Sequence, residues 1–225
     1  EGIPDDFEFG TLPEDVDHIE EQLGYAIDRI PILGETGIKI FFNGPESFTP
    51  DNRYFLGPSP EVSNFFVAAG FNSIGIQSAG GAGKVLAEWI VKGRAPMDLW
   101  DVDIRRMMPF QKNKHYLHDR TVEALGLLYA MHWPFRQPES ARGVRTSPFH
   151  LRLKAHGACF GETAGWERAN WFAPSGIDPV YEYSFKKQNW FPFSASEHCA
   201  VRERVGVFDM SSFGKFLLQG PDACK

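Results

Sequence analysis

The chain has 225 residues, of which 43% are apolar and 20 are phenylalanine, so it can build a sizeable core and is not a disordered chain. A formal net charge of −6 gives no electrostatic footprint for nucleic acid, and no apolar run reaches the roughly 18 residues of a membrane span. The 3 cysteines are too scattered for a disulfide framework or a cysteine-based zinc site. We therefore expect an intracellular protein without a nucleic-acid partner or a membrane span.

The N-terminal region has mixed α and β character. Apolar residues at helical spacing predict an amphipathic helix over 13–30, opened by a capping box at Thr11–Glu14. The apolar run 37–42 predicts a strand, and the proline- and glycine-containing run 43–57 predicts a loop.

A strand–loop–helix unit follows. The segment 64–69 is almost wholly apolar, which predicts a short strand buried on both faces. The next helix is expected to begin near Gly80 and to end at Gly93, which can adopt the left-handed conformation of a helix C-cap.

The texture changes after residue 100. Residues 101–112 are mixed, and a helix is predicted over 113–131. Glycines, prolines and aromatic residues predict short strands and turns over 132–193. A capping box at Ser194–Glu197 predicts a short helix, and 212–219 predicts a strand that would begin a new unit.

Three zones result, 1–100, 101–193 and 194–225, in a chain that combines α+β and α/β features. The sequence starts without methionine and stops directly after a strand-like segment. We therefore expect it to be a piece of a longer polypeptide.

The glycine-rich run 70–90 resembles a nucleotide loop, but two familiar patterns fail. A P-loop needs Ser or Thr after its lysine, whereas Val85 follows Gly83-Lys84. A Rossmann turn needs a third glycine where Leu86 stands. The run remains a loop before a helix, whose free N–H groups and positive dipole end would point back at the loop.

A family resemblance rests on several motifs that occur in a fixed order along nearly the whole chain. They resemble the sarcosine and dimethylglycine dehydrogenases, in which an FAD-dependent amine oxidase half is fused to a folate-binding half of aminomethyltransferase type. The motifs are PESFTPDNRYFLG (45–57), GFNSIGIQSAGGAGKVLAEWIVKGRAP (70–96), DVDIRR (101–106), GWERANWF (165–172) and FDMSSFGKF (208–216).

The resemblance implies a domain for each zone. Residues 1–100 would be the C-terminal part of an FAD oxidoreductase domain with the two-domain, glutathione-reductase-like FAD fold. Residues 101–193 would be a mixed central domain, and 194–225 would open the folate-binding domain with its first strand. The family's dinucleotide-binding segment, its flavin-linking histidine and the catalytic aspartate of its folate domain have no counterpart here. The catalytic residues are therefore unknown, and the chain alone is not expected to be a competent enzyme.

The resemblance also implies which residues bind the cofactor. Those that match the family's segment along the isoalloxazine ring are Asn72, Ser73, Ile74, Gly75, Ile76 and Gln77. By this resemblance, the position of Gln77 is occupied in related simple sarcosine oxidases by a lysine, which helps to hold the substrate carboxylate. A neutral amide cannot replace that charge, so either another group binds the carboxylate or the substrate differs. The run could instead be only a tight strand–helix turn.

The activity implied is oxidative demethylation of an N-methylated glycine, sarcosine or dimethylglycine, with FAD as cofactor. Tetrahydrofolate would take the one-carbon unit, and an electron acceptor would reoxidise the flavin. The location would be the mitochondrial matrix in a eukaryote or the cytoplasm in a bacterium. One alternative is a non-catalytic regulatory subunit of pyruvate dehydrogenase phosphatase, which has stretches similar to Gly80–Trp89 and Arg145–Pro148. Another, a plain aminomethyltransferase, is disfavoured because only the last residues resemble one.

Some polar residues have a structural and a chemical interpretation. Thr49–Asp51 match a loop near the family's flavin, but a turn in which Asp51 caps its own backbone is favoured. His115 and His118 could share a helix face and bind a metal, but two exposed histidines without a metal are favoured.

The C-terminal half contains further candidates. Glu162, Glu167 and Arg168 could form a charged pocket around a tryptophan, yet a structural salt bridge is favoured. Asp209 and Ser211 are expected to have a turn or capping role, and Cys199 is expected to be unreactive because the first turn of its helix holds no cationic activator.

Overall fold

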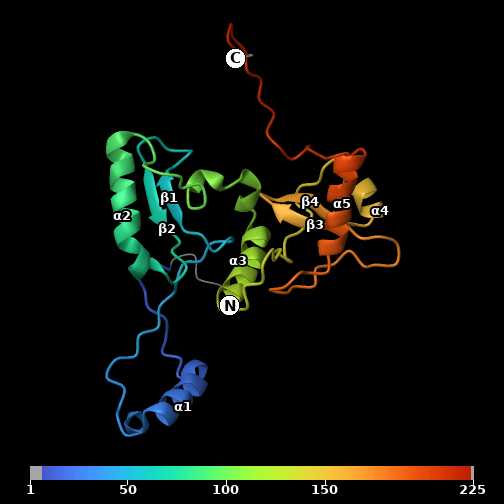
Figure 1. Cartoon of the computed structure of the whole chain (residues 1–225). Helices are drawn as coiled ribbons and strands as arrows, with labels where there is room; N and C mark the ends of the chain where they lie inside the picture. Colours follow the sequence, from blue (N-terminus) through green and yellow to red (C-terminus); the bar gives the residue numbers. More distant parts are fainter. Residues whose placement is uncertain (1–6, 224–225) are drawn as a thin grey trace. The chain divides into compact units, whose positions relative to one another are not determined.

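The computed structural model describes residues 7–223, which form two units, 7–47 and 48–223 (Figure 1). In the first unit, a 3₁₀ turn at Asp17–Ile19 leads into α1 (Glu20–Arg29). A second turn follows at Pro31–Gly34. Asn43 closes this unit, because its carbonyl accepts from the Leu12 N–H at 2.8 Å and its amide donates to the Pro13 carbonyl at 2.8 Å.

Two predictions for the first unit are wrong. The helix predicted over 13–30 is present but begins later. The Asp15 carboxylate accepts from the His18 N–H at 3.0 Å at its start, so the capping box predicted at Thr11–Glu14 does not form. The segment 37–42 is not a strand, because no described residue pairs with it. A strand exists only through its hydrogen-bonded partner, which an apolar run cannot supply by itself.

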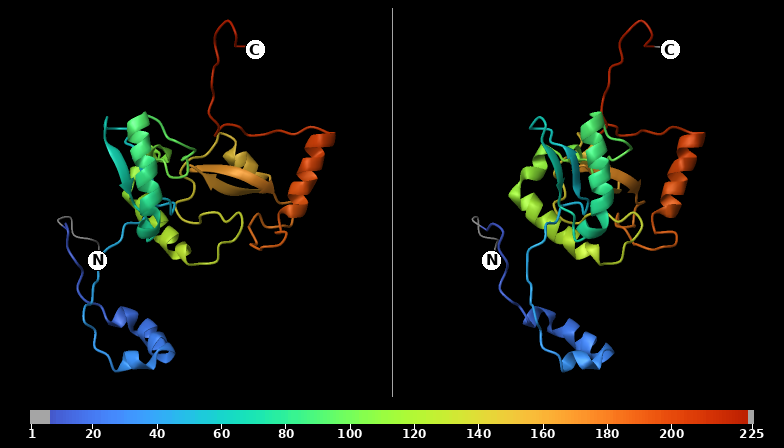
Figure 2. Two further views of the ribbon diagram at one scale, coloured as in Figure 1. Left: turned by 60° about the vertical axis from the view of Figure 1, so that its left-hand side comes forward. Right: turned by 90° about the vertical axis from the view of Figure 1, so that its left-hand side faces the viewer.

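The second unit begins with a hairpin of two antiparallel strands, β1 (Phe55–Pro58) and β2 (Phe66–Ala69). Helix α2 (Gly75–Lys92) lies against this hairpin in both figures (Figures 1 and 2). Trp89 of α2 is buried beneath β1, where a Cβ on Gly57 would come within 2.8 Å of the indole. Glycine at position 57 therefore allows helix and strand to pack closely.

The structure alters three predictions here. β1 lies at the end of the segment predicted as the loop 43–57. β2 is not buried on both faces, since Ala68 and Ala69 are exposed. α2 begins at Gly75 rather than near Gly80. The turn that precedes the helix ends early, at Asn72 and Ser73, which have left-handed backbone. The left-handed C-cap predicted at Gly93 is confirmed, with φ of 68°.

After α2, two short turns lead to the next helix of this unit. Two 3₁₀ turns, Ile104–Arg106 and Pro109–Lys112, lead into α3 (Lys114–Leu128), which confirms the helix predicted over 113–131. The side chain of Asn113 caps α3 by accepting hydrogen bonds from two backbone N–H groups of the first turn. The buried face of α3 carries Tyr116, Arg120 and Ala124 at successive helical turns.

The last part holds a second antiparallel hairpin and two helices. Helix α4 (His150–Ala155) precedes β3 (Ala158–Thr163) and β4 (Trp166–Phe172), and α5 (Phe191–Glu203) packs against β4 (Figure 1). The core of this part contains buried Cys159, Trp171 and Ala173, with partly buried aromatic residues packed around them. Short strands and turns over 132–193 are therefore confirmed.

Two C-terminal predictions are wrong. α5 begins at Phe191, so Ser194 lies inside the helix and cannot cap it. Residues 212–219 form no strand, and Phe216 with its two leucine neighbours is exposed, because no described residue pairs with this segment. The architecture is mixed α and β, as predicted. Within 7–223, no helix combines the length and apolarity needed to cross a membrane.

Candidate functional site

The residues predicted to bind a flavin gather at the start of α2. Asn72 and Ser73 both have left-handed backbone, with φ of 50° and 63°, and they turn the chain from β2 into the helix. Ile74, the N-cap residue, offers no side-chain cap. Among residues 7–223, the first N–H groups of α2 thus receive no cap from the N-cap side chain, and by their position they have no intrahelical partner; the helix dipole adds positive potential there.

Asn72 differs from its neighbours because its side chain faces the interior. It is only 2% exposed. Its amide oxygen accepts from the Thr49 N–H at 2.8 Å, and its amide nitrogen donates to the Gly70 carbonyl at 2.7 Å and to the Thr49 hydroxyl at 3.2 Å. Both donor positions of the amide are thus occupied by protein atoms.

The following residues form an open surface. Ile76 is 100% exposed and Gln77 is also exposed. Helical spacing places Gly80 and Gly83 on the face of Ile76, and a Cβ at either glycine would meet nothing within 4 Å. An exposed apolar side chain, bare helix backbone and uncapped N–H groups suit the redox end of a flavin, which is flat and becomes negatively charged on reduction. The surface therefore fits the cofactor that the sequence predicts.

An ion pair with a buried arginine is linked to this turn through Thr49, whose hydroxyl donates to Asp51 at 3.2 Å. Asp51 accepts from Arg106 through both carboxylate oxygens, at 2.8 and 2.9 Å, and from the Arg53 N–H at 3.2 Å. Asp51 thus caps its own turn, as predicted. Sequence reasoning missed Arg106, although it lies in the quoted motif DVDIRR; its guanidinium is buried over the Phe55 ring, 4.9 Å from the centroid.

The structural salt bridge predicted among Glu162, Glu167 and Arg168 is confirmed for the two glutamates, whereas Arg168 takes no part and instead stacks over the Phe213 ring. Glu162 and Glu167 lie opposite each other on the two strands. Arg120 of α3 pairs with Glu162 at 2.9 Å, and Arg142 pairs with Glu167 at 2.5 Å. Burial by itself would raise the pKa of Glu167, but the hydrogen bonds from Arg142 and the Gly143 N–H bring that pKa below its ordinary value.

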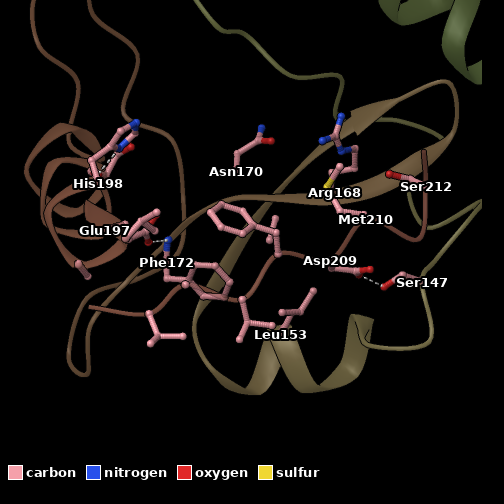
Figure 3. A pocket seen from close by; sticks show the side chains of 18 of the residues that line it. Ser147, Leu153, Arg168, Asn170, Phe172, Glu197, His198, Asp209, Met210 and Ser212 are labelled. Atoms are coloured by element: carbon pink, nitrogen blue, oxygen red, sulfur yellow. Dashed lines mark hydrogen bonds between the residues drawn. The ribbon is translucent and has the colours of Figure 1, made fainter. Parts of the chain in front are cut away.

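A second candidate site is a cavity of about 530 Å³ between β4, α5 and the segment that follows α5 (Figure 3). Its walls are mostly apolar, and a cavity of this volume and lining suits a small organic ligand. Arg168 is on the β4 wall (Figure 3). Its guanidinium lies 4.4 Å from the centre of the Phe213 ring. Labelled side chains on the walls include Leu153, Asn170, Phe172, Glu197, His198 and Met210.

Asp209 lies at the edge of this cavity in the predicted turn. Its carboxylate accepts from the Ser211 N–H at 3.0 Å and from the Ser147 hydroxyl (Figure 3). The hydrogen bonds from Ser147 and Ser211 lower the pKa of Asp209. The carboxylate thus ties the segment after α5 to the segment before α4.

The histidines and cysteines give no further site among the described residues. His115 and His118 are exposed on α3, and no cluster of three or more candidate metal ligands occurs within 7–223. Burial raises the pKa of the Cys159 thiol to about 11, so this thiol stays protonated. Cys199 is exposed on α5, and Cys224 lies outside the described residues.

Three family models match the chain in succession. Residues 2–89 match the FAD dependent oxidoreductase model, and 92–147 match the FAD dependent oxidoreductase central domain. Residues 149–225 match the GCVT N-terminal domain. The start of α2 lies in the first of these matches, and the cavity of Figure 3 is lined almost entirely by residues of the third.

Relatives match over most of the chain. A 4-methylaminobutanoate oxidase (formaldehyde-forming) of Paenarthrobacter nicotinovorans is 52% identical over 96% of the chain and 26% of its own length. Human mitochondrial sarcosine dehydrogenase is 36% identical over 100% of the chain, which corresponds to 27% of the length of that relative. The mitochondrial pyruvate dehydrogenase phosphatase regulatory subunit of mouse is 40% identical over 93% of the chain, which corresponds to 24% of the length of that subunit. Mammalian dimethylglycine dehydrogenases match as well.

The chain thus spans about a quarter of the length of the curated relatives that it matches. Its matches nevertheless follow one another from the oxidoreductase model to the aminomethyltransferase-type model, in the order predicted from the motifs. The chain belongs to the family in which an FAD-dependent oxidoreductase is joined to an aminomethyltransferase-type domain.

Proposed function

We propose that the full-length protein carries out FAD-dependent oxidative N-demethylation of an N-methylated amino acid. The observation that carries this proposal is the open start of α2, with uncapped N–H groups beside exposed Ile76, inside the segment that matches the FAD dependent oxidoreductase model. Relatives whose names describe this kind of oxidation match nearly the whole chain. Bound FAD would accept a hydride from the N-methyl carbon.

The chain's own residues would orient and polarise the bound cofactor. The first-turn N–H groups of α2, contributed by Gly75, Ile76 and Gln77, would stabilise negative charge near the ring, an effect worth about 0.3–1 kcal/mol when exposed and up to about 2 kcal/mol when partly buried. Ile76 would offer an apolar contact and exclude water beside the reacting carbon.

The substrate proposed is a secondary or tertiary N-methyl amino acid. The candidates differ in the number of carbons between the nitrogen and the carboxylate. Gln77 is exposed and neutral, so it cannot form an ion pair with a substrate carboxylate. Sarcosine and dimethylglycine carry that carboxylate one carbon from nitrogen, whereas the substrate named for the Paenarthrobacter relative carries it farther away. We include 4-methylaminobutanoate as a third candidate beside the two glycines.

The test is anaerobic titration of the full-length protein. It should be yellow, and one of the three amino acids should bleach the flavin absorbance at a rate that saturates with concentration. A flavin that none of them reduces would sink the proposal. The N-demethylated amine, identified by mass spectrometry, would show which bond was cleaved, and added electron acceptors would show which one restores the colour.

One-carbon transfer to tetrahydrofolate is proposed for the aminomethyltransferase-type part. Residues 149–225 match the GCVT N-terminal domain, and the cavity of Figure 3 offers apolar walls with Arg168 available for an anionic group. Measuring formaldehyde release with and without tetrahydrofolate tests this step. Release that tetrahydrofolate leaves unchanged would remove folate from the proposal.

A regulatory role is the second candidate, because the mouse phosphatase regulatory subunit is 40% identical over 93% of the chain. A protein of that type would not be reduced by any N-methyl amino acid and would instead alter the activity of a pyruvate dehydrogenase phosphatase. The two measurements, made on one preparation, separate the candidates.

Domain limits and location remain proposals. Limited proteolysis of the full-length protein would place cuts near residues 100 and 193 if the predicted division holds, or near 90 and 148 if the limits of the matched models are the physical ones. Cell fractionation would test the predicted matrix or cytoplasmic location.

A further inference from the structure

The turn before α2 is held in an unfavourable backbone conformation. Asn72 and Ser73 are consecutive non-glycine residues with positive φ, 50° and 63°. The left-handed conformation costs roughly 1–2 kcal/mol for an ordinary residue, and less for asparagine. Such a turn persists only where surrounding contacts enforce it.

The contacts that enforce this turn converge on one buried amide. Asn72 links the Thr49 N–H and hydroxyl to the Gly70 carbonyl, so it joins the segment before β1 to the end of β2. The Thr49 hydroxyl in turn donates to the Arg53 carbonyl at 3.1 Å. Tyr54 and Phe71 stack over the same junction with centroids 4.7 Å apart.

The support continues to a buried cation. Arg106 donates to the carboxylate of Asp51 and, at 2.5 Å, to the Arg53 carbonyl. The amide of Asn72 is therefore the inner end of a hydrogen-bonded chain that runs through Thr49 to Arg106. No described atom of this chain lies on the exposed face of α2 that carries Ile76.

We propose that Asn72 is a positioning residue for the redox cofactor: its buried amide fixes the left-handed turn and thereby the place and direction of the first N–H groups of α2. This inference rests on the proposed function, because it takes a flavin as the group those N–H groups face. It assigns Asn72 a role distinct from that of exposed Gln77, since the Asn72 side chain acts through the backbone rather than by contact.

The experiment compares two asparagine-to-glycine substitutions in the full-length protein. Asn72→Gly removes the amide but tolerates positive φ, so the turn remains allowed and is no longer held. Asn64→Gly is the matched control, because Asn64 also has left-handed backbone, with φ of 60°, and its side chain is exposed. The measurements are the visible spectrum of the flavin, its midpoint potential and the melting temperature.

Asn72→Gly should shift the flavin absorbance and lower the potential, because negative charge on the reduced ring loses fixed donors. The expected change is up to about tenfold in the reduction equilibrium, which is about 30 mV for a two-electron couple. Asn64→Gly should leave both values at those of the unaltered protein. A lower melting temperature with an unchanged spectrum and potential would show a purely structural role and overturn the inference.

Thr49→Val provides a second test if Asn72→Gly does not fold. It deletes only the hydroxyl partner and keeps the backbone N–H, so it should move the potential in the same direction by a smaller amount. An unchanged potential in a folded Thr49→Val protein would then overturn the inference. If the unaltered protein itself holds no flavin, the proposed function fails instead, which keeps the two failures distinct.

Discussion

The turn before α2 and the β3–β4 hairpin are both held by arginine–carboxylate pairs with at least one buried member, but the surfaces beside the pairs differ. Beside α2, the Asp51–Arg106 pair is linked to the turn through the Thr49 hydroxyl, and the exposed start of α2 carries Ile76 and bare backbone. In the hairpin, Glu162 and Glu167 face each other and each is closed by its own arginine. The first arrangement uses charge to hold a ligand-facing backbone in place, whereas the second uses charge to join α3 to a sheet.

The difference shows that a cluster of charged residues need not be the ligand site. The hairpin has the denser set of buried charges, yet its carboxylates are engaged by protein donors. The α2 turn exposes few charges and offers N–H groups instead. The comparison predicts that substitutions in the hairpin change stability, whereas substitutions at the turn also change the cofactor environment.

The largest expected effect is the loss of Arg120. Arg120→Ala removes the cation beside buried Glu162 and leaves its carboxylate uncompensated, which should cost about 3–5 kcal/mol. A urea denaturation curve of the full-length protein measures this loss. Arg53→Ala is the control, because the Arg53–Asp101 pair is exposed on both sides and should matter little. Equal losses in the two variants would contradict the role given to burial.

A methyl group at Gly70 should have the next largest effect. Gly70 has φ of 67°, and a Cβ there would lie 2.7 Å from the Thr49 methyl group that packs beneath the turn. Gly70→Ala should therefore cost about 2–4 kcal/mol through strain and overpacking. Gly93→Ala separates the two causes, because Gly93 has φ of 68° and open space around it. If both variants lose the same stability, the contact with Thr49 is unimportant.

Acid should weaken the hairpin through Glu167, by a smaller amount. The folded-state pKa of Glu167 lies below its ordinary value of 4.5, so its contribution is complete above that pH and is lost as pH falls through the folded-state pKa. Glu167→Gln should lower stability at neutral pH and flatten the loss below pH 4.5. Melting temperatures between pH 7 and pH 3 measure this difference. An acid dependence that survives the substitution unchanged would assign it to other carboxylates.

The smallest effect is expected at a short but exposed pair. Lys112 and Glu61 approach to 2.5 Å, yet both side chains are mostly in solvent. Water screens such a pair, so Lys112→Ala should leave the melting temperature unchanged within error. A loss comparable to that of Arg120→Ala would mean that distance, rather than burial, decides the strength of ion pairs in this protein.

Local patterns in the sequence predicted the elements whose stability is local. The periodicity of 113–131 predicted α3, and Gly93 was expected to cap α2, because helix hydrogen bonds and caps join residues close in sequence. The start of α2 was placed five residues too late. The left-handed turn that sets it depends on Thr49, which is distant in sequence from Asn72, and no local pattern encodes that contact.

Strands and buried charges were harder to predict for the same reason. The apolar runs 37–42 and 212–219 have strand composition but no partner among the described residues. Arg106 was not singled out in the sequence, and its burial follows from contacts with Asp51, the Arg53 carbonyl and the Phe55 ring that exist only in the folded chain. The ordered motifs predicted the family, whereas the fixed position of the Asn72 amide became visible only in three dimensions.

The segment 37–42 has a practical consequence for anyone who produces this polypeptide. Ile38, Ile40 and Phe42 alternate along the sequence on both sides of a bend at Lys39 and are exposed. A strand-like row of apolar side chains with unpaired backbone is a template for pairing with another molecule. Expression of this segment without a covering partner should therefore yield aggregates, and a charged residue in place of Ile40 should improve the recovery of dispersed protein.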